Sequence, residues 1–297
     1  MNDKFFPTYQ LEIETSNGSI VIPNNNRYFN ITASINYAYS ESPNTCDISI
    51  YNLNKASRDA IFFDAWDYFT FRKVTFKAGY NGNLQMLFNG NIKEAYSDRN
   101  GADVSTHISA WDNFWYINNY TEKNIFSGAD RNQVLTEILS DLKTNEDETA
   151  NIIMSDFTDE PDNLRMETLK GRPQDLVKER IGQDASLFFA DGTIYVLKDN
   201  DALGDENGIP VINSASGLLG VPVKRNRIVE FKMLFEPSLR IGRAFKLESN
   251  FSDILNGTYK VLSVSHSLSL GENIGGENTT TVRAWNSNQG FNFIGFF

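Results

Sequence analysis

The segment Thr106-His107-Ile108-Ser109-Ala110-Trp111-Asp112 has a similar counterpart in Thr280-Thr281-Val282-Arg283-Ala284-Trp285-Asn286. Both segments alternate polar and apolar residues, which is typical of β-strands with one buried face. Both end in Ala-Trp followed by Asp or Asn. Two such strands in one chain indicate a duplicated β module rather than an active site.

The similarity extends upstream of each Ala-Trp strand. In each copy a Phe-Lys dipeptide comes first and an Asn-Gly dipeptide follows: Phe76-Lys77 with Asn89-Gly90, and Phe245-Lys246 with Asn256-Gly257. The Phe and the Trp are 35 positions apart in the first copy and 40 in the second. The loop before the last strand, at 98–101 and at 271–277, accommodates the difference. A chance similarity between two short β segments is the alternative.

The patterns around this repeat predict a mainly β protein with an α+β part. A β domain is expected at 1–115, a small α+β domain at 116–200, a connector at 201–226, and a second β domain with an aromatic tail at 227–297. Six or more short strands in the first domain suit a barrel or a sandwich. Helices are predicted at 55–63 with Asn54 as N-cap, at 130–142, and after Arg172-Pro173. The polar stretch 143–149 is predicted to be a solvated loop.

Composition narrows the class of protein. The chain has 297 residues, 40% of them hydrophobic, and a formal net charge of −11. Gripping nucleic acid requires clustered Lys and Arg, so the charge argues against a DNA-binding protein but permits one that DNA slides past. No apolar run approaches the ~20 residues of a membrane span. The single cysteine, Cys46, cannot form an internal disulfide, which fits maturation in a reducing cytoplasm.

The motifs of common enzymes are missing from the sequence. His107 and His266 both fall in predicted strands, and the sequence contains no HExxH, CxxC or DxDxDG. An acidic cluster, at Asp156, Asp159, Glu160 and Asp162, suits Ca²⁺ binding or glycoside hydrolysis, but solvated surface is the favoured interpretation. We therefore predict no enzyme activity, no catalytic, cofactor-binding or metal-binding residue, and no cofactor.

Three stretches resemble the baseplate hub proteins of bacteriophage tails, which are related to the hub part of type VI secretion spikes. Ile48-Ser49-Ile50-Tyr51-Asn52-Leu53 precedes the predicted helix and is followed by strands at 74–80 and 87–92. Near the C-terminus, 235–242 leads to Asn256-Gly257-Thr258-Tyr259-Lys260-Val261 and to Val264-Ser265-His266, with 217–222 just upstream. The resemblance and the repeat together give these signature residues: Tyr51, Asn52, Leu53, Gly79, Tyr80, Gly90, Trp111, Pro237, Gly242, Gly257, Tyr259, His266 and Trp285.

The resemblance implies that both β domains are tail-tube-like barrels. It also implies a virion structural protein, assembled in the cytoplasm of the host bacterium, that forms a homotrimer with six similar modules in a ring. The expected partners are a tail tube or distal tube protein, a central spike protein and other baseplate proteins, with DNA passing through an axial channel unbound. Residues 144–170 match nothing in the resemblance.

Two other functions remain open on the sequence alone. The aromatic content of 13% suits a receptor-binding tail module, which would bind host cells saturably. The acidic cluster suits a cell-wall hydrolase, which would clear a cell-wall suspension. The C-terminal residues Phe291, Phe293, Phe296 and Phe297 either pack on the protein itself or dock onto a partner chain. Trp111 and Trp285 are candidate anchors of the two β cores.

Overall fold

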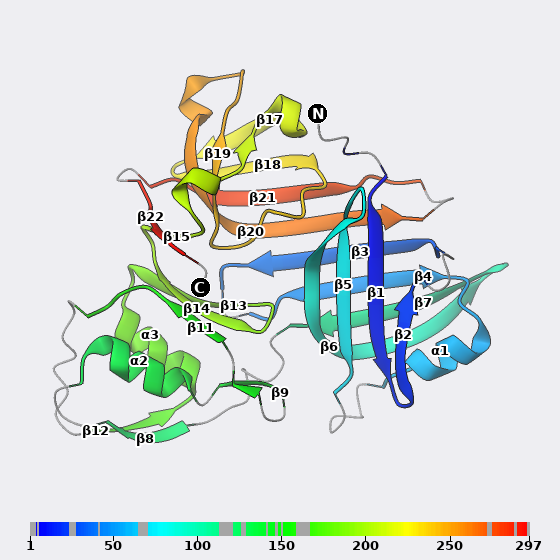
Figure 1. The fold of residues 1–297 in the computed structure, drawn as a ribbon, viewed down its shortest axis with the longest axis horizontal. Helices are drawn as coiled ribbons and strands as arrows, with labels where there is room; N and C mark the ends of the chain where they lie inside the picture. Colours follow the sequence, from blue (N-terminus) through cyan, green and yellow to red (C-terminus); the bar gives the residue numbers. More distant parts are fainter. Residues whose placement is uncertain are drawn as a thin grey trace.

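The computed structural model describes residue 4 and residues 6–23, 28–40, 42–64, 71–112, 121–125, 129–140, 142–145, 148–149, 151–158, 167–271, 275–287 and 290–295. A 13-stranded sheet runs through the molecule, and a smaller α+β unit lies beside it (Figure 1). This confirms the mainly β class with an α+β part. The described strand pairs follow an open path from one sheet edge to the other.

The first module contains seven strands and one helix: β1 (Thr8–Thr15), β2 (Gly18–Ile22), β3 (Ile31–Ala38), β4 (Thr45–Tyr51), α1 (Lys55–Ile61), β5 (Lys73–Tyr80), β6 (Asn83–Asn100) and β7 (Asp103–Trp111). Its strand order is β3-β4-β7-β6-β5-β1-β2. Alternate residues of β3 and β4 are buried, as the sequence pattern predicts. The predicted N-cap is confirmed, because the Asn54 side chain accepts a hydrogen bond from the Ser57 backbone N–H.

The α+β unit has its own core. It comprises β8 (Thr121–Ile125), α2 (Arg131–Leu139), β9 (Lys143–Asn145), β10 (Glu148–Thr149), β11 (Asn151–Met154), β12 (Glu167–Gly171), α3 (Pro173–Ile181), β13 (Ala185–Ala190) and β14 (Thr193–Lys198). Both predicted helices are confirmed; α2 buries Val134, Leu135, Ile138 and Leu139, and Pro173 stands in the first turn of α3. The predicted loop at 143–149 instead carries the paired strands β9 and β10, since backbone pairing needs no apolar alternation.

The second module follows a stretch that was predicted as a connector. That stretch contains β15 (Asp201–Leu203), β16 (Val211–Ile212) and β17 (Leu218–Arg225), with short 3₁₀ turns at Glu206–Gly208 and Ser214–Ser216. Strands β18 (Ile228–Leu234), β19 (Ala244–Leu247), β20 (Gly257–Leu270) and β21 (Thr279–Trp285) follow, with a 3₁₀ turn at Asp253–Leu255 and β22 (Asn292–Ile294) at the end. The domain boundaries themselves stay predictions.

The two modules share one strand order. β17-β18-β21-β20-β19 in the second module corresponds to β3-β4-β7-β6-β5 in the first. In both, the Ala before the Trp pairs with the residue just before a bulge: Ala110 with Ile92, and Ala284 with Val261. The same bulge next to the same dipeptide supports a true duplication.

The register of the repeat differs from the sequence alignment by two residues. Matching the Ala-Trp pairs places Phe245 opposite Tyr259 at the position where Val74 lies opposite Gly90, so Phe245 does not correspond to Phe76. The Asn-Gly dipeptides are displaced likewise. A shift of two keeps every side chain on the same face of the sheet, so the buried pattern alone does not exclude it.

One ladder joins the modules. β3 and β20 pair antiparallel from Ile31↔Leu270 to Ala38↔Ser263. The sheet then turns, so that β5 and β1 cross in front of β3 and β4 (Figure 1). A single cluster of buried residues contains side chains from β1, β3, β5, β18, β20 and β21, which makes the core continuous across the ladder.

The core anchors differ from the tryptophans expected from the sequence. Trp111 and Trp285 are only half-buried, whereas Phe76, Phe245 and Tyr259 are fully buried. Phe245 packs its ring against Tyr259 at a centroid distance of 5.8 Å. The aromatic core therefore lies one strand away from the Ala-Trp dipeptide at Tyr259 and two strands away at Phe76 and Phe245.

We predict that Phe245→Ala lowers the free energy of unfolding by about 3–5 kcal/mol, because it removes a fully buried ring. The matched control is Phe251→Ala in the same module, where the ring is 73% exposed and the change should be within about 0.5 kcal/mol. Denaturant unfolding measures both values. Equal losses in the two variants would contradict this assignment of the core.

Candidate assembly site

The described part of the chain contains no group of three His, Cys, Asp or Glu side chains that could hold a metal ion. Asp156 is solvent-exposed and accepts hydrogen bonds from Thr158 and Asn132, which lower its pKa. Its three partners in the predicted acidic cluster, Asp159, Glu160 and Asp162, lie outside the described residues.

The two histidines and the cysteine lie in strands of the large sheet. His266 is buried with its Nδ1 2.9 Å from Thr280 Oγ1, and burial lowers its pKa to about 3, so it is neutral. His107 lies 2.9 Å from Ser49 Oγ and 3.3 Å from Asp98 Oδ1 on the sheet surface. Cys46 is fully buried, which raises its pKa and suppresses thiolate chemistry.

Lys260 joins three parts of the chain. Its Nζ donates to the backbone carbonyls of Lys198, Asp199 and Asp201 at 3.2, 2.6 and 3.1 Å. It also lies 5.0 Å from the Tyr39 ring centre in the first module and 5.7 Å from that of Trp285. Burial lowers the pKa of this ammonium to about 8, partly offset by Asp199 and Asp201. Because these carbonyl oxygens accept hydrogen bonds from the buried ammonium, Lys260 holds the segment after β14 in place beside both modules.

A second polar joint fixes the β13–β14 hairpin. Asp191 accepts a hydrogen bond from Tyr37 Oη at 2.7 Å and pairs with Arg240 Nη1 at 2.8 Å. Beside it, Asn44 donates to Asp112 Oδ2 at 2.6 Å and to the Phe189 carbonyl at 2.7 Å. Burial raises the pKa of both carboxyl groups, and Arg240 opposes the rise at Asp191. This joint ties the α+β unit to both modules.

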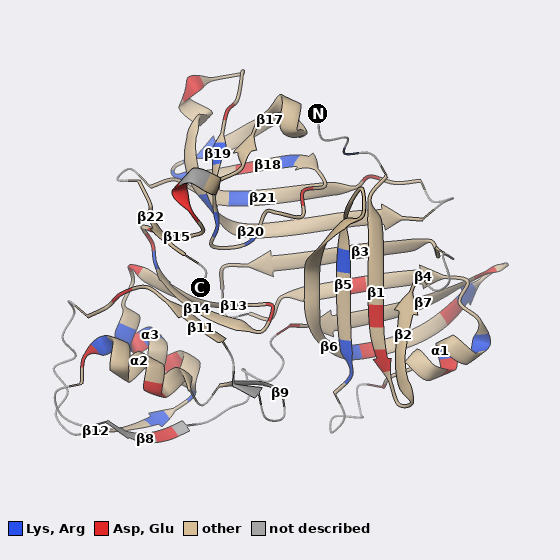
Figure 2. Ribbon diagram, viewed as in Figure 1, with Lys and Arg blue, Asp and Glu red and all other residues tan. Residues whose placement is uncertain are grey.

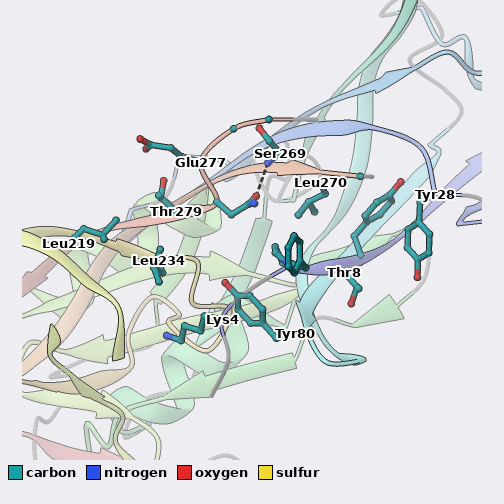
Figure 3. Close-up of a pocket in the computed structure, with 17 residues that line it drawn as sticks. Lys4, Thr8, Tyr28, Tyr80, Leu219, Leu234, Ser269, Leu270, Glu277 and Thr279 are labelled. Atoms are coloured by element: carbon teal, nitrogen blue, oxygen red, sulfur yellow. Dashed lines mark hydrogen bonds between the residues drawn. The ribbon is translucent and has the colours of Figure 1, made fainter. Parts of the chain in front are cut away.

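A cleft of about 890 Å³ opens where the N-terminal segment meets the second module (Figure 3). Tyr28 and Tyr80 line one part of it, and Leu219, Leu234 and Leu270 add apolar surface. Lys4 is engaged in an ion pair with Glu236 at 2.6 Å, and Asn278 accepts from the Ser269 backbone N–H at 2.8 Å. Its lining combines these aromatic and aliphatic side chains with polar residues such as Lys4, Asn278 and Thr279.

Several signature residues of the first module serve the backbone. Asn52 has a left-handed φ of 59° and bonds Val104 at the start of β7 through backbone and side chain. Leu53 is buried beside the end of β4 at Tyr51. Gly79 and Gly90 lie in close approaches: a Cβ there would meet the Asn83 carbonyl oxygen at 2.0 Å and the Trp111 carbonyl oxygen at 2.6 Å.

Other signature residues connect the modules or complete the second one. Tyr80 Oη donates to the Phe235 carbonyl across the junction at 3.0 Å, and Tyr259 Oη donates to the Leu255 carbonyl at 2.8 Å. Gly242 has a φ of 78° and bonds both Leu203 and Val261 through its backbone. Pro237 is buried after β18, and Gly257 begins β20.

The C-terminal tail is described as far as residue 295. Phe291 packs edge-on against Trp285 at 5.8 Å, and the strand containing Phe293 pairs in parallel with β15. Both rings are half-buried on the chain itself. Phe296 and Phe297 lie outside the described residues.

Two exposed strand edges stand out. In β17, alternate residues Leu219, Val221 and Val223 are 39%, 49% and 51% exposed, and among the described strands β17 pairs only with β18. In β6, residues 96–100 extend beyond β5 and are all exposed, including Tyr96 at 46%. Sheet edges of this kind are templates for pairing with another chain. Acidic and basic positions are interspersed over the described strands (Figure 2).

Comparison with known proteins gives a family match. Residues 12–272 match a family model described as "Baseplate hub gp41". No curated protein matches the sequence significantly. None of the helices in the described part of the chain is long and apolar enough to cross a membrane.

Several solved structures share the fold at low sequence identity. The 43 kDa tail protein of prophage MuSo2 from Shewanella oneidensis is 8% identical with a TM-score of 0.58, covering 93% of this chain and 98% of that one. The tail protein from Neisseria meningitidis MC58 is 8% identical with a TM-score of 0.59, covering 94% and 96%. The Escherichia coli c3393 protein, a type VI secretion component with structural similarity to the T4 tail proteins gp27 and gp5, is 9% identical with a TM-score of 0.58, covering 94% and 78%.

The sequence missed the residues that fix the joints. Lys260 and Arg240 lie inside the stretches that resemble the hub family. Because lysine and arginine side chains are seldom buried, the sequence did not indicate that either one is buried. Asp191 precedes Gly192, a dipeptide typical of hairpin turns, and nothing next to it in the sequence marks its contacts with Tyr37 and Arg240. The exposed stripe of β17 lay in the predicted connector, where its alternation of Leu219, Val221 and Val223 was the available signal.

We predict a pH dependence that belongs to Lys260. Between its folded pKa of about 8 and its ordinary value of 10.5, the unfolded chain holds a proton that the folded chain has released, so stability rises with pH in this window. Compared with Lys260→Met, the wild-type free energy of unfolding should gain roughly 3 kcal/mol between pH 8 and 10.5. Denaturant titrations at several pH values measure the difference. If the free energies of unfolding of the wild type and of Lys260→Met changed with pH in parallel, the burial of the Lys260 ammonium would be contradicted.

Proposed function

Because this chain belongs to the Baseplate hub gp41 family, we propose that it is the structural hub of a bacteriophage tail baseplate and forms a homotrimeric, pseudo-six-fold ring. The ring joins a six-fold tail tube to a three-fold central spike. It leaves an axial channel through which DNA passes during ejection. The family match and the tail-protein fold support the hub role; the ring, its partners and its channel are the proposal.

The observation that carries the proposal is the duplication inside one chain. Two modules with the same strand order and the same bulge beside Ala-Trp lie edge to edge through β3 and β20. Three such chains would supply six similar modules. A body built this way presents six-fold contacts on one face while keeping three-fold symmetry, which matches the two kinds of partner that a hub must hold.

The net charge of the chain suits a channel through which DNA passes. The net charge of −11 disfavours lasting contacts with the phosphate backbone, so DNA would pass without specific binding. The fully buried Cys46 is compatible with assembly in the reducing cytoplasm of the host, followed by residence in the virion. The remaining partners would be other baseplate proteins around the ring.

A structural role is favoured over the two alternatives. For a hydrolase, the sequence offered the acidic cluster, yet its described member, Asp156, is fully exposed and satisfied by Thr158 and Asn132. For a receptor-binding module, the sequence offered aromatic content, yet many of the described aromatic side chains, including Phe76, Phe88 and Tyr259, are buried in the core. Joints built from Lys260 and Asp191 suit a rigid connector better than a mobile adhesin.

We predict that the purified protein forms a trimer. Light scattering during size-exclusion chromatography, over a range of concentrations, should give a mass near three times 33.6 kDa. Electron micrographs of that fraction should show rings with six similar lobes. A monomer at every concentration, both alone and mixed with its tube and spike proteins, would contradict the proposal, as would closed rings of four or more chains.

A further inference from the structure

We propose that the free edge of β17 in one copy pairs antiparallel with the free end of β6 in a second copy, with Val223 opposite Asp98. This inference rests on the ring of the proposed function and supplies its chain-to-chain junction. It follows from the junction that the chain already contains, between β3 and β20.

The template is the edge of the first module. β3 is the outermost strand on that side of the module, and its Asn36 pairs with Ser265 of β20. Asn36 also pairs with Thr45, and Thr45 pairs with Trp111. Two steps across the sheet therefore lead from the repeated tryptophan to the residue that meets the other module.

The same steps in the second module end on β17. Trp285 pairs with Ile228, and Ile228 pairs with Arg225. Arg225 thus occupies the position of Asn36, but β17 has no described strand on its outer side. The outer edge of β3 in the first module is therefore paired with β20, whereas the equivalent edge of β17 has no described partner.

The receiving strand has an equivalent as well. Ser265 lies four residues beyond Val261, which pairs with Ala284 beside the bulge. In the first module, Ile92 pairs with Ala110 beside the same bulge, and four residues beyond it lies Tyr96. By equivalence, Tyr96 of one copy meets Arg225 of the next. Ser97 then meets Lys224, and Asp98 meets Val223.

The free backbone groups agree with this register. The Ala95 N–H and C=O both bond Phe63, on the side of β6 that faces away from β7. By alternation, the N–H and C=O of Ser97 also face away from β7. Arg225 and Ile228 close a two-residue turn and face each other, so the backbone groups of Lys224 face away from β18. Ser97 and Lys224 are the pair that the register brings together.

The side chains are complementary in charge and in apolar character. Glu94 and Asp98 are exposed on the β6 side, and Arg225 and Arg227 are exposed on the β17 side. Neither Glu94 nor either arginine has an ion pair with another described residue. The register brings Glu94 opposite the turn that contains Arg227. Val221 and Val223, opposite Asn100 and Asp98, would lose their exposure in the same junction.

The geometry of the chain allows a ring. β17 is the last strand at one end of the strand order, and β6 lies on the other side of the β3–β20 ladder (Figure 1). A contact between two different surfaces of this kind is heterologous and closes into a ring when each step turns by a fixed angle. β3–β20 junctions within chains and β17–β6 junctions between chains would then alternate around it.

The test is a designed cross-link, Asp98→Cys with Val223→Cys. Opposed residues in an antiparallel ladder have Cα atoms about 4.5–5.5 Å apart, within the range of a disulfide. Both positions are exposed, and the native Cys46 is buried and will not compete. Under oxidation, we expect a species of three linked chains on a non-reducing gel that returns to one chain with reductant.

The matched control is Ser97→Cys with Val223→Cys. Ser97 is equally exposed and adjacent on the same strand, but its side chain points to the other face of the sheet, so cross-linking should fall at least tenfold. The non-oxidised variants should keep the wild-type mass by light scattering.

The outcomes separate the pairing from the ring. A wild-type-like trimer without the Asp98→Cys/Val223→Cys cross-link would overturn the β17–β6 pairing and leave the hub function standing. Cross-linked dimers or open chains without a trimer would support the pairing and overturn the three-chain ring. Monomers without any cross-link would overturn both. Equal cross-linking in the matched control would also overturn the register.

Discussion

The antiparallel ladder between β3 and β20 is the interaction on which the rest of the structure depends. It converts two separate β modules into one sheet with a continuous core. Because its backbone bonds fix both the spacing and the direction of the strands, the second module has a defined orientation relative to the first. As a result, Tyr80 meets Phe235 in a hydrogen bond and Lys4 meets Glu236 in an ion pair, both at fixed positions across the junction.

The polar joints make this arrangement specific rather than merely stable. Moving the Lys260 ammonium out of water costs free energy, as the lowering of its pKa to about 8 shows. Three carbonyl oxygens and two aromatic rings offset that cost only if the segment after β14 lies where it does. Asp191 makes a similar demand on Tyr37 and Arg240. Alternative placements of the α+β unit would leave these groups buried without partners, a penalty of several kcal/mol each.

Local patterns in the sequence predicted the local structure well. Alternation located β7 and β21, and the N-cap at Asn54 and the first-turn proline Pro173 were correct because the start of a helix depends on a few neighbouring residues. The pairing of residues 31–38 with 263–270 was not foreseen, since either strand could have paired with any complementary edge. The two-residue register shift was also not foreseen, because a shift of two residues leaves every side chain on the same face of the sheet. Lys260 was missed because nothing local marks a lysine for burial, and carbonyls distant in sequence surround it.

The two open edges each carry features that limit pairing before the proposed ring assembles. Pro222 removes an N–H from the outer edge of β17, and Phe63 covers Ala95 at the root of the free β6 end, so each edge offers only a few backbone groups. Charges of opposite sign on the two edges oppose pairing of like with like and favour pairing of β17 with β6. A short ladder of this kind is weak in an open pair. In a closed ring every junction forms at once, and the last one closes without a further loss of translational freedom, so ring closure selects the complete assembly over open chains.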